Sequence, residues 1–360
     1  MSSEQYTDKE DVYPYITGAS SLNSEGIILN RWTHTPTQIV KRGDILLVCK
    51  GSGVGQLTVL SNVDKAHIAR QIMGIRAKNT ESQLFIYHYL SRLMTELKKR
   101  STGIIPGIDR KSILSLHISI PSLQEQQKVA ELLSLIEQRI ITQNKIIEKY
   151  ESLIQAICNT LIEAEQPKVE LSFNDFGEPY SGLSGKSSED FGKGCQYITY
   201  MNVYQNQIID ITDVGFVKIN ETEQQSVVRY GDILFTLSSE TPNEVGMGAV
   251  YLGDTYPLYL NSFCFGVHII DESKIFPPFL AYYISTKSFR KAVFPLAQGS
   301  TRFNLQKSDF MKKKFLFPTV EKQNKIYSVL KAYSDKLSIE KNIANLLCEQ
   351  KSYLLRQLFI

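Results

Sequence analysis

The chain has 360 residues, and its 40 basic and 37 acidic side chains give a net charge of +3. This balance excludes a protein that holds nucleic acid mainly by bulk charge, although local basic patches stay compatible with DNA binding. Apolar residues make up 42% and charged residues 21% of the chain, which favours folded domains over disorder. At about 150 residues per domain, the length predicts two or three domains.

The first residues lack the basic and apolar regions of a secretory leader, and no run approaches the ~18 apolar residues of a membrane span. The five cysteines are scattered and form no C-x-x-C pair. We therefore expect reduced thiols, no metal site and a cytoplasmic location.

Residues 1–120 are predicted to form a mixed, strand-rich domain. Short β-favouring runs such as DILLVC (44–49) and QLTVL (56–60) are separated by Gly, Asn and Pro, and a helix is expected over 81–99.

A long helix is predicted over 121–164. It begins at Pro121 and Ser122, and Glu125 stands at the spacing of a capping box. Its apolar residues alternate at spacings of four and three, which is the heptad pattern of a coiled-coil seam. The apolar seam residues of this helix are Val129, Leu133, Ile136, Ile140, Ile147 and Ile154.

The second half of the chain repeats the first in the same order. Tyr15-Ile16-Thr17 recurs at 197–199, Gly43-Asp44-Ile45-Leu46 recurs at 231–234, and IPSLQEQQKVAELL (120–133) matches FPTVEKQNKIYSVL (317–330). We therefore predict a second mixed domain at 165–317 and a second long helix at 318–360. The apolar seam residues of the second helix are Ile326, Leu330, Tyr333, Leu337, Leu347 and Leu354.

Two matched heptad seams favour an intramolecular coiled coil, and two helices of an ordinary bundle are the alternative. Each seam has a polar residue near its middle, Gln143 and Glu340, as in coiled coils that fix their register in this way. The predicted fold class is α+β, with two similar mixed α/β domains separated by two long antiparallel helices in a pseudo-two-fold repeat.

A family resemblance is carried by the two Gly-Asp-Ile-Leu runs, the Gly299-Ser300-Thr301 loop and the two matched helix starts that follow a proline. Through these features the chain resembles the specificity subunit of type I restriction–modification systems. The resemblance covers nearly the whole chain. It implies that each mixed domain is a target-recognition domain for one half of a split double-stranded DNA site, with the helices as spacers. Only 14 residues precede Tyr15, fewer than the family usually has. The first domain is therefore expected to lack part of its opening element, through natural variation, truncation or a permuted arrangement.

The resemblance also implies a non-catalytic subunit that docks two adenine methyltransferase subunits, with restriction subunits joining for cleavage. S-adenosylmethionine, ATP and Mg²⁺ would belong to those partners, and this chain would hold no cofactor. Apolar residues outside the seams predict surfaces that such partners, or the mixed domains, would cover. They are Leu132, Ile146, Leu153, Val329, Ile343 and Leu346.

Candidate DNA-binding residues are polar side chains in Gly-rich loops, because these match the hydrogen-bonding patterns of base edges and phosphates. A solvated loop explains any one of them equally well. Arg302 would suit a guanine or a phosphate, and Asn304 an adenine. The first-domain candidates are Ser20, Ser21, Asn23, Lys50, Ser52, Arg100, Ser101, Thr102 and Arg110. The second-domain candidates are Tyr200, Asn202, Ser238, Ser239, Thr241, Asn243, Gln298, Ser300, Thr301, Arg302 and Asn304.

No enzyme motif accompanies these features. The KGSGVG run (50–55) lacks the spacing of a phosphate-binding loop, and neither a D-P-P-Y tetrapeptide nor a nuclease cluster is present. The basic runs at 98–100 and 312–314 are either solvated faces or phosphate clamps. The alternative function is a coiled-coil scaffold whose domains bind protein, which would show no salt-sensitive, sequence-specific DNA binding.

Overall fold

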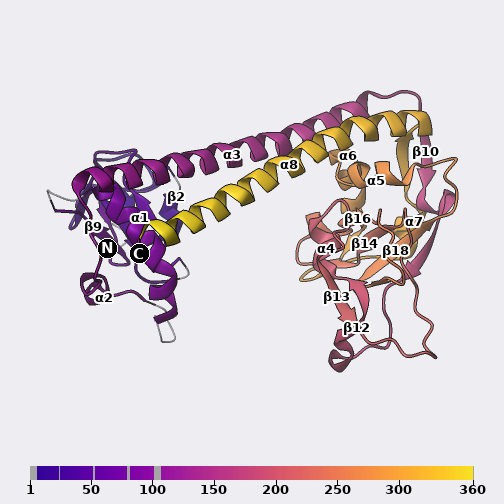
Figure 1. Cartoon of the computed structure of the whole chain (residues 1–360). Helices are drawn as coiled ribbons and strands as arrows, with labels where there is room; N and C mark the ends of the chain where they lie inside the picture. The colour runs from indigo at the N-terminus through magenta and orange to yellow at the C-terminus, as the bar shows by residue number, and fades with distance from the viewer. Residues whose placement is uncertain (1–5, 24, 52, 79–81, 101–106, 360) are drawn as a thin grey trace. The chain divides into compact units, whose positions relative to one another are not determined.

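The computed structural model describes residues 6–23, 25–51, 53–78, 82–100 and 107–359, with the backbone alone at positions 95, 99 and 100. The chain divides into two compact units, Met1–Ile147 with Glu340–Ile360 and Glu148–Ile339. Each unit holds one strand-rich domain and part of both long helices, α3 (Leu123–Ala164) and α8 (Val320–Leu358) (Figure 1). Among the described residues, no helix is long and apolar enough to cross a membrane.

Two small sheets form the domain of the first unit. One has the order β4 (Trp32–Thr33), β1 (Tyr13–Ile16), β8 (Lys65–Ile68) and β5 (Ile39–Lys41), and the other β7 (Leu57–Val59), β6 (Ile45–Val48) and β9 (Ile72–Ile75). A short hairpin of β2 (Leu22–Asn23) and β3 (Gly26–Ile27) and two helices, α1 (Gln83–Arg100) and α2 (Arg110–Leu114), complete the domain. The helix predicted at 81–99 is thus confirmed as α1.

The unbroken apolar run after Gly43-Asp44 forms strand β6, which is buried on both faces. Ile45 and Leu47 point to the cluster formed with α1, whereas Leu46 and Val48 point to the cluster formed with the other sheet. A strand that is buried on both faces has no polar alternation.

The second unit contains the corresponding strands and several more. Its main sheet has the order β11 (Gly177–Ser181), β18 (Cys264–Ile269), β14 (Ile233–Thr236) and β16 (Gly248–Val250). A second sheet has the order β13 (Val214–Val217), β12 (Phe191–Ile198) and β17 (Tyr259–Leu260). A third comprises β15 (Ser238–Ser239), β20 (Phe303–Leu305) and β19 (Ala297–Gln298), and β10 (Lys168–Ser172) pairs with β21 (Lys314–Pro318). The helices are α4 (Tyr200–Gln205), α5 (Pro277–Tyr283), α6 (Lys287–Val293) and α7 (Lys307–Lys312).

The strand registers confirm the internal repeat. Tyr15 pairs in parallel with His67 in β1 and β8, and Tyr197 pairs in parallel with Tyr259 in β12 and β17. Strand β6 lies between β7 and β9, as β14 lies between β16 and β18, and all four pairings are antiparallel. The two domains therefore share one strand plan.

The opening segments of the two domains differ. In the second unit, β10 covers β21 with five residue pairs, and Phe173 and Phe176 follow it into the core. In the first unit, residues 116–122, at the place of β21, form no strand.

The two long helices begin as predicted. Ser122 and Glu125 form the capping box, with the Ser122 amide donating to Glu125 Oε2 at 3.1 Å and the Glu125 amide donating to Ser122 Oγ at 3.4 Å. In the first unit the helices run antiparallel, because Glu137 pairs with Lys351 while Gln143, further along α3, bonds to Glu340, earlier in α8. All twelve predicted apolar seam residues are buried or half-buried. The α+β fold class with two long antiparallel helices is confirmed.

A candidate nucleic-acid interface

A braced turn precedes the candidate site in each repeat. Gly43 and Gly231 have φ angles of 91° and 86°, a left-handed conformation that favours glycine. The following carboxylate, Asp44 or Asp232, accepts a hydrogen bond at 2.8 Å from the amide three residues before it. These turns fix the start of β6 and β14, whose far ends lead to Lys50 and Ser238.

The side-chain partners of this carboxylate differ between the repeats. Asp44 is held by the Arg76 guanidinium at 2.5 and 2.6 Å. Asp232, which is buried, accepts from the Tyr180 hydroxyl at 2.7 Å and lies 2.9 Å from His268 Nδ1. The same brace is therefore built from different side chains.

The third sheet of the second unit brings predicted residues together. Ser238 of β15 lies opposite Asn304 of β20, and Asn304 lies opposite Gln298 of β19. Residues that are paired across antiparallel strands share one face of a sheet, so these three polar side chains form a row. In the next row, Ser239 is buried and Phe303 packs on the core, which places the apolar side of the sheet opposite the polar row.

A cavity of about 410 Å³ adjoins this sheet. Its lining residues are Tyr200, Met201, Tyr204, Ser238, Ser239, Glu240, Glu244, Phe263 and Arg302. The Tyr200 and Tyr204 rings lie parallel, 6.0 Å apart, and both are anchored: Tyr200 donates to the Ser238 carbonyl at 2.7 Å, and Tyr204 donates to Glu244 at 2.8 Å. The wall is therefore rigid and aromatic.

Glu244 is a fixed negative charge of this cavity. Hydrogen bonds from the Thr241 and Tyr204 hydroxyls lower the pKa of its carboxyl below the usual range. The same bond raises the pKa of Tyr204, which stays a neutral donor. Both groups are thus committed to each other and not to a ligand.

The first unit has a cavity at the equivalent place, of about 290 Å³. It is lined by Thr17, Gly18, Ala19, Ser20, Lys50, Gly51, Gly53 and Gln71. Lys50 forms an isolated antiparallel bridge with Gly107, which matches the pairing of Ser238 with Asn304 at the repeat offsets. The two cavities therefore occupy the same place in the repeat, but small residues, a lysine and a glutamine line one, and aromatic, acidic and arginine side chains line the other.

Three predicted DNA-binding residues have internal roles instead. Ser21 is buried and accepts from the Thr17 amide at 3.1 Å. Asn202 is buried and donates to the carbonyls of Asp210 and Asp213 at 2.7 and 2.6 Å. Ser239 is buried and donates to the Thr241 carbonyl. A side chain that is enclosed and satisfied in this way is not presented to a ligand.

The other predicted residues are placed on the surface or outside the described residues. Exposed side chains are those of Ser20, Asn23, Lys50, Arg110, Thr241, Asn243, Gln298, Ser300, Thr301, Arg302 and Asn304. Tyr200 and Ser238 are half-buried. Ser52, Ser101 and Thr102 lie outside the described residues, as does the side chain of Arg100.

One of the two basic runs is partly committed within the fold. Lys314 pairs with Asp175 at 2.7 Å, an interaction that lowers the pKa of that carboxyl. Lys312 is exposed and Lys313 is half-buried. In the first run, Lys98 is exposed, whereas the side chains at 99 and 100 are outside the described residues.

Two buried glutamines that sequence reasoning missed join each domain to its long helix. Gln126 donates to the Pro121 carbonyl at 2.9 Å and accepts from the Ser82 amide at 2.8 Å, before α1. Gln323 donates to the Pro318 carbonyl at 2.8 Å and accepts from the Phe276 amide at 2.8 Å, before α5. The signal was available, because both glutamines stand five residues after the proline of the matched helix starts.

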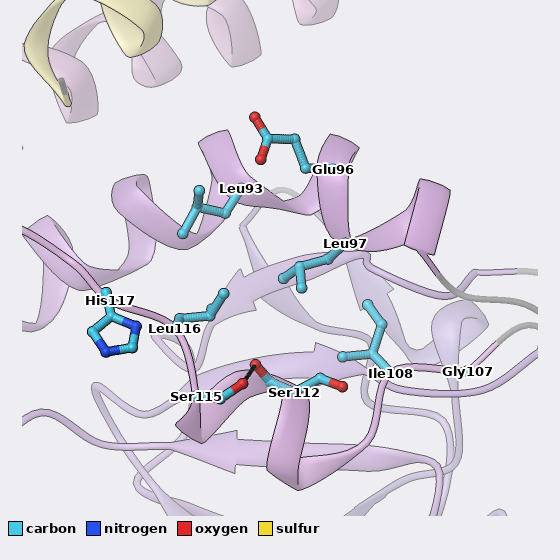
Figure 2. A pocket seen from close by; sticks show the side chains of 9 residues that line it. All are labelled: Leu93, Glu96, Leu97, Gly107, Ile108, Ser112, Ser115, Leu116 and His117. Atoms are coloured by element: carbon cyan, nitrogen blue, oxygen red, sulfur yellow. Dashed lines mark hydrogen bonds between the residues drawn. The ribbon is translucent and has the colours of Figure 1, made fainter.

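A further cavity, of about 370 Å³, lies between α1 and α2 in the first unit (Figure 2). Leu93 and Leu97 of α1 face Ile108 and Leu116 across it, and Ser112 and Ser115 lie at its base. None of its described lining residues is a predicted DNA-binding residue. Among the described residues, no group of His, Cys, Asp and Glu side chains is arranged to hold a metal ion.

This architecture, a duplicated strand-rich domain with two long helices and loop residues suited to base edges, defines a class of DNA-recognition subunits. Residues 1–152 and 183–349 match the family described as the type I restriction modification DNA specificity domain, and the chain belongs to this family.

Relatives and solved structures agree with this assignment. The specificity subunit of the type I restriction enzyme MjaVIII from Methanocaldococcus jannaschii is 24% identical over 355 residues, covering 92% of this chain and 81% of the relative. The type I restriction–modification S subunit from M. genitalium has a TM-score of 0.56 at 18% identity, covering 100% of this chain and 91% of that one. A chain from a structure on complex assembly and conformational transition of the type I system has a TM-score of 0.59 at 15% identity, covering 96% and 91%.

Proposed function

We propose that the chain reads a two-part target in double-stranded DNA, with one half read by each repeat. The pair of equivalent cavities carries this proposal. A shared strand plan would present both cavities to DNA in the same manner, and their different side chains would select different bases.

We propose that α3 and α8 set the distance between the two halves of the target and recruit the partners. These would be two adenine-N6 methyltransferase subunits together with restriction subunits. Support comes from apolar side chains outside the seams that stay exposed within their own units, because exposed apolar surface on long helices favours a protein partner. The exposed residues are Leu132, Leu153, Val329, Ile343 and Leu346, and Ile146 is half-buried.

The chain would act without a chemical step of its own. S-adenosylmethionine, ATP and Mg²⁺ would bind to the partner subunits, and this chain would supply target choice and assembly. A cytoplasmic location, where the cellular DNA lies, is part of the same proposal.

The decisive test is a methylation map. The chain is expressed with an adenine methyltransferase subunit of a type I restriction–modification system in a host that lacks DNA methylation, and N6-methyladenine is mapped across the genome. A motif with two defined halves around unspecified bases is the expected result. Absence of methylation from an assembled complex would contradict the proposal.

A domain exchange then tests the assignment of halves. Residues 165–317 are replaced by the second recognition domain of another specificity subunit, and the helices are left intact. One half of the methylated motif should change while the other half stays. A change in both halves, or in neither, would refute the hypothesis that each repeat reads one half of the target.

A further inference from the structure

We infer that the second repeat reads a C·G base pair through Arg302 and Glu240, a step that rests on the proposed DNA-reading function and names what its site recognises. Both residues line the cavity of about 410 Å³ beside the sheet of β15, β20 and β19. Glu240 was not among the residues that the sequence singled out.

The strand register brings the two side chains to one edge. Ser239 lies opposite Phe303 in the antiparallel pair of β15 and β20. Glu240 directly follows β15, and Arg302 directly precedes β20, so both stand at the end of the ladder next to the Ser239–Phe303 pair. Glu240 and Arg302 therefore line the cavity beside the end of the β15–β20 ladder, close to the row of Ser238, Asn304 and Gln298.

Both groups are exposed and uncommitted. Within the described part of the chain, neither the Glu240 carboxylate nor the Arg302 guanidinium makes a hydrogen bond or an ion pair. Glu244, the other carboxylate of the cavity, differs because Thr241 and Tyr204 already occupy it. Glu240 and Arg302 are therefore the charged groups of this cavity that are available to a ligand.

An available carboxylate narrows the choice of ligand. Phosphate groups repel it, so a surface that only tracks the DNA backbone gains nothing from Glu240. In the major groove, a carboxylate accepts a hydrogen bond from the exocyclic amine of cytosine, and an arginine donates two to O6 and N7 of guanine. One acidic and one guanidinium group at the same edge therefore match the two bases of a single C·G pair.

The rest of the cavity supports such a contact. Met201 and Phe263 expose 46% and 59% of their surface, and the anchored Tyr200 and Tyr204 rings stand beside them. With a base edge bound, these apolar groups would shield the two charged side chains from water, which strengthens their hydrogen bonds to the base. Among the described lining residues of the equivalent cavity in the first unit, Lys50 and Gln71 are the large polar side chains, so the inference is made for the second repeat.

The test compares Glu240→Ala and Arg302→Gln with the unmodified chain, each assembled with the methyltransferase, by mapping N6-methyladenine. We expect each variant to lose about 10- to 100-fold of its preference for C·G at one and the same position of one half-site, with the other half-site unchanged. Glu272→Ala and Lys291→Gln, at exposed positions outside the cavity, serve as matched controls that should keep the full motif.

The outcomes separate the two proposals. If the unmodified assembly produces no split motif, the proposed function itself fails. If it does, and Arg302→Gln weakens methylation at every site equally while the motif stays intact, Arg302 binds a phosphate and the inference is overturned. An unaltered motif with Glu240→Ala overturns it as well. Because both side chains are exposed, a thermal melt of each purified assembly should match that of the unmodified chain.

Discussion

Replacing Gln323 with alanine should destabilise the second domain through two buried backbone groups. The glutamine is fully buried, and it satisfies the Pro318 carbonyl and the Phe276 amide with bonds of 2.8 Å each. Alanine removes both hydrogen bonds and supplies no donor or acceptor in their place. A buried group left without its partner costs about 1–3 kcal/mol, so for the two groups we expect a loss of about 2–6 kcal/mol in the free energy of unfolding.

The assay is chemical denaturation of the purified chain, followed by hydrogen exchange to localise the change. Exchange should accelerate at the start of α5 and α8 in Gln323→Ala, and at the start of α1 and α3 in the matched variant Gln126→Ala. Gln127→Ala is the control, because that side chain is exposed. A loss below about 0.5 kcal/mol, or exchange that rises evenly over both domains, would refute the bracing role.

Three further predictions follow from other sites. His88 is buried, and desolvation lowers the pKa of its imidazole to about 4, whereas in the unfolded state this pKa is near 6.5. Acid therefore favours the unfolded state, and this group should remove about 2 kcal/mol from the free energy of unfolding between pH 7 and pH 5. Denaturation curves at the two pH values should show a smaller difference for His88→Phe. Gly43→Ala should cost about 1 kcal/mol through its positive φ alone, since no atom lies within 4 Å of an added Cβ; an unchanged melting temperature would speak against the strained turn. Inserting one heptad in both α3 and α8 should lengthen the unspecified spacer of the methylated motif, and a spacer that stays the same in an assembled complex would count against the helices as its determinant.

The repeat and the helices could be predicted because they depend on periodicity and order. The seam residues recur at the heptad spacing in both halves, and a period survives any loop insertion between the two copies. The capping box at Ser122 depends on residues only three apart. Such local patterns need no knowledge of the tertiary structure.

The candidate site was less predictable because it depends on which polar side chains the fold buries in internal hydrogen bonds. Asn202 lies in the short helix α4 and Ser21 in a helical turn before β2, although both segments read as polar loops in the sequence. Tertiary packing encloses the two side chains, and they hydrogen-bond to nearby backbone groups. Glu240 was missed because acidic residues are unexpected beside DNA, and its place next to Arg302 follows only from the pairing of β15 with β20. Sequence composition gives the residue types of a surface, whereas register decides which of them meet.

Some features are the same in the two repeats and others differ, which argues that one set of residues determines the fold and another determines the DNA target. Three features have the same geometry in both repeats. They are the braced turns at Gly43 and Gly231, the parallel pairing of β1 with β8 and of β12 with β17, and the hydrogen bonds of the buried glutamines. The cavities at the strand ends have different linings on that common frame. Since exposed side chains at such positions contribute little to stability, they can change without loss of the fold. A duplicated scaffold of this kind would acquire a new half-site through a few surface substitutions in one repeat, while the other repeat and the helices keep their function.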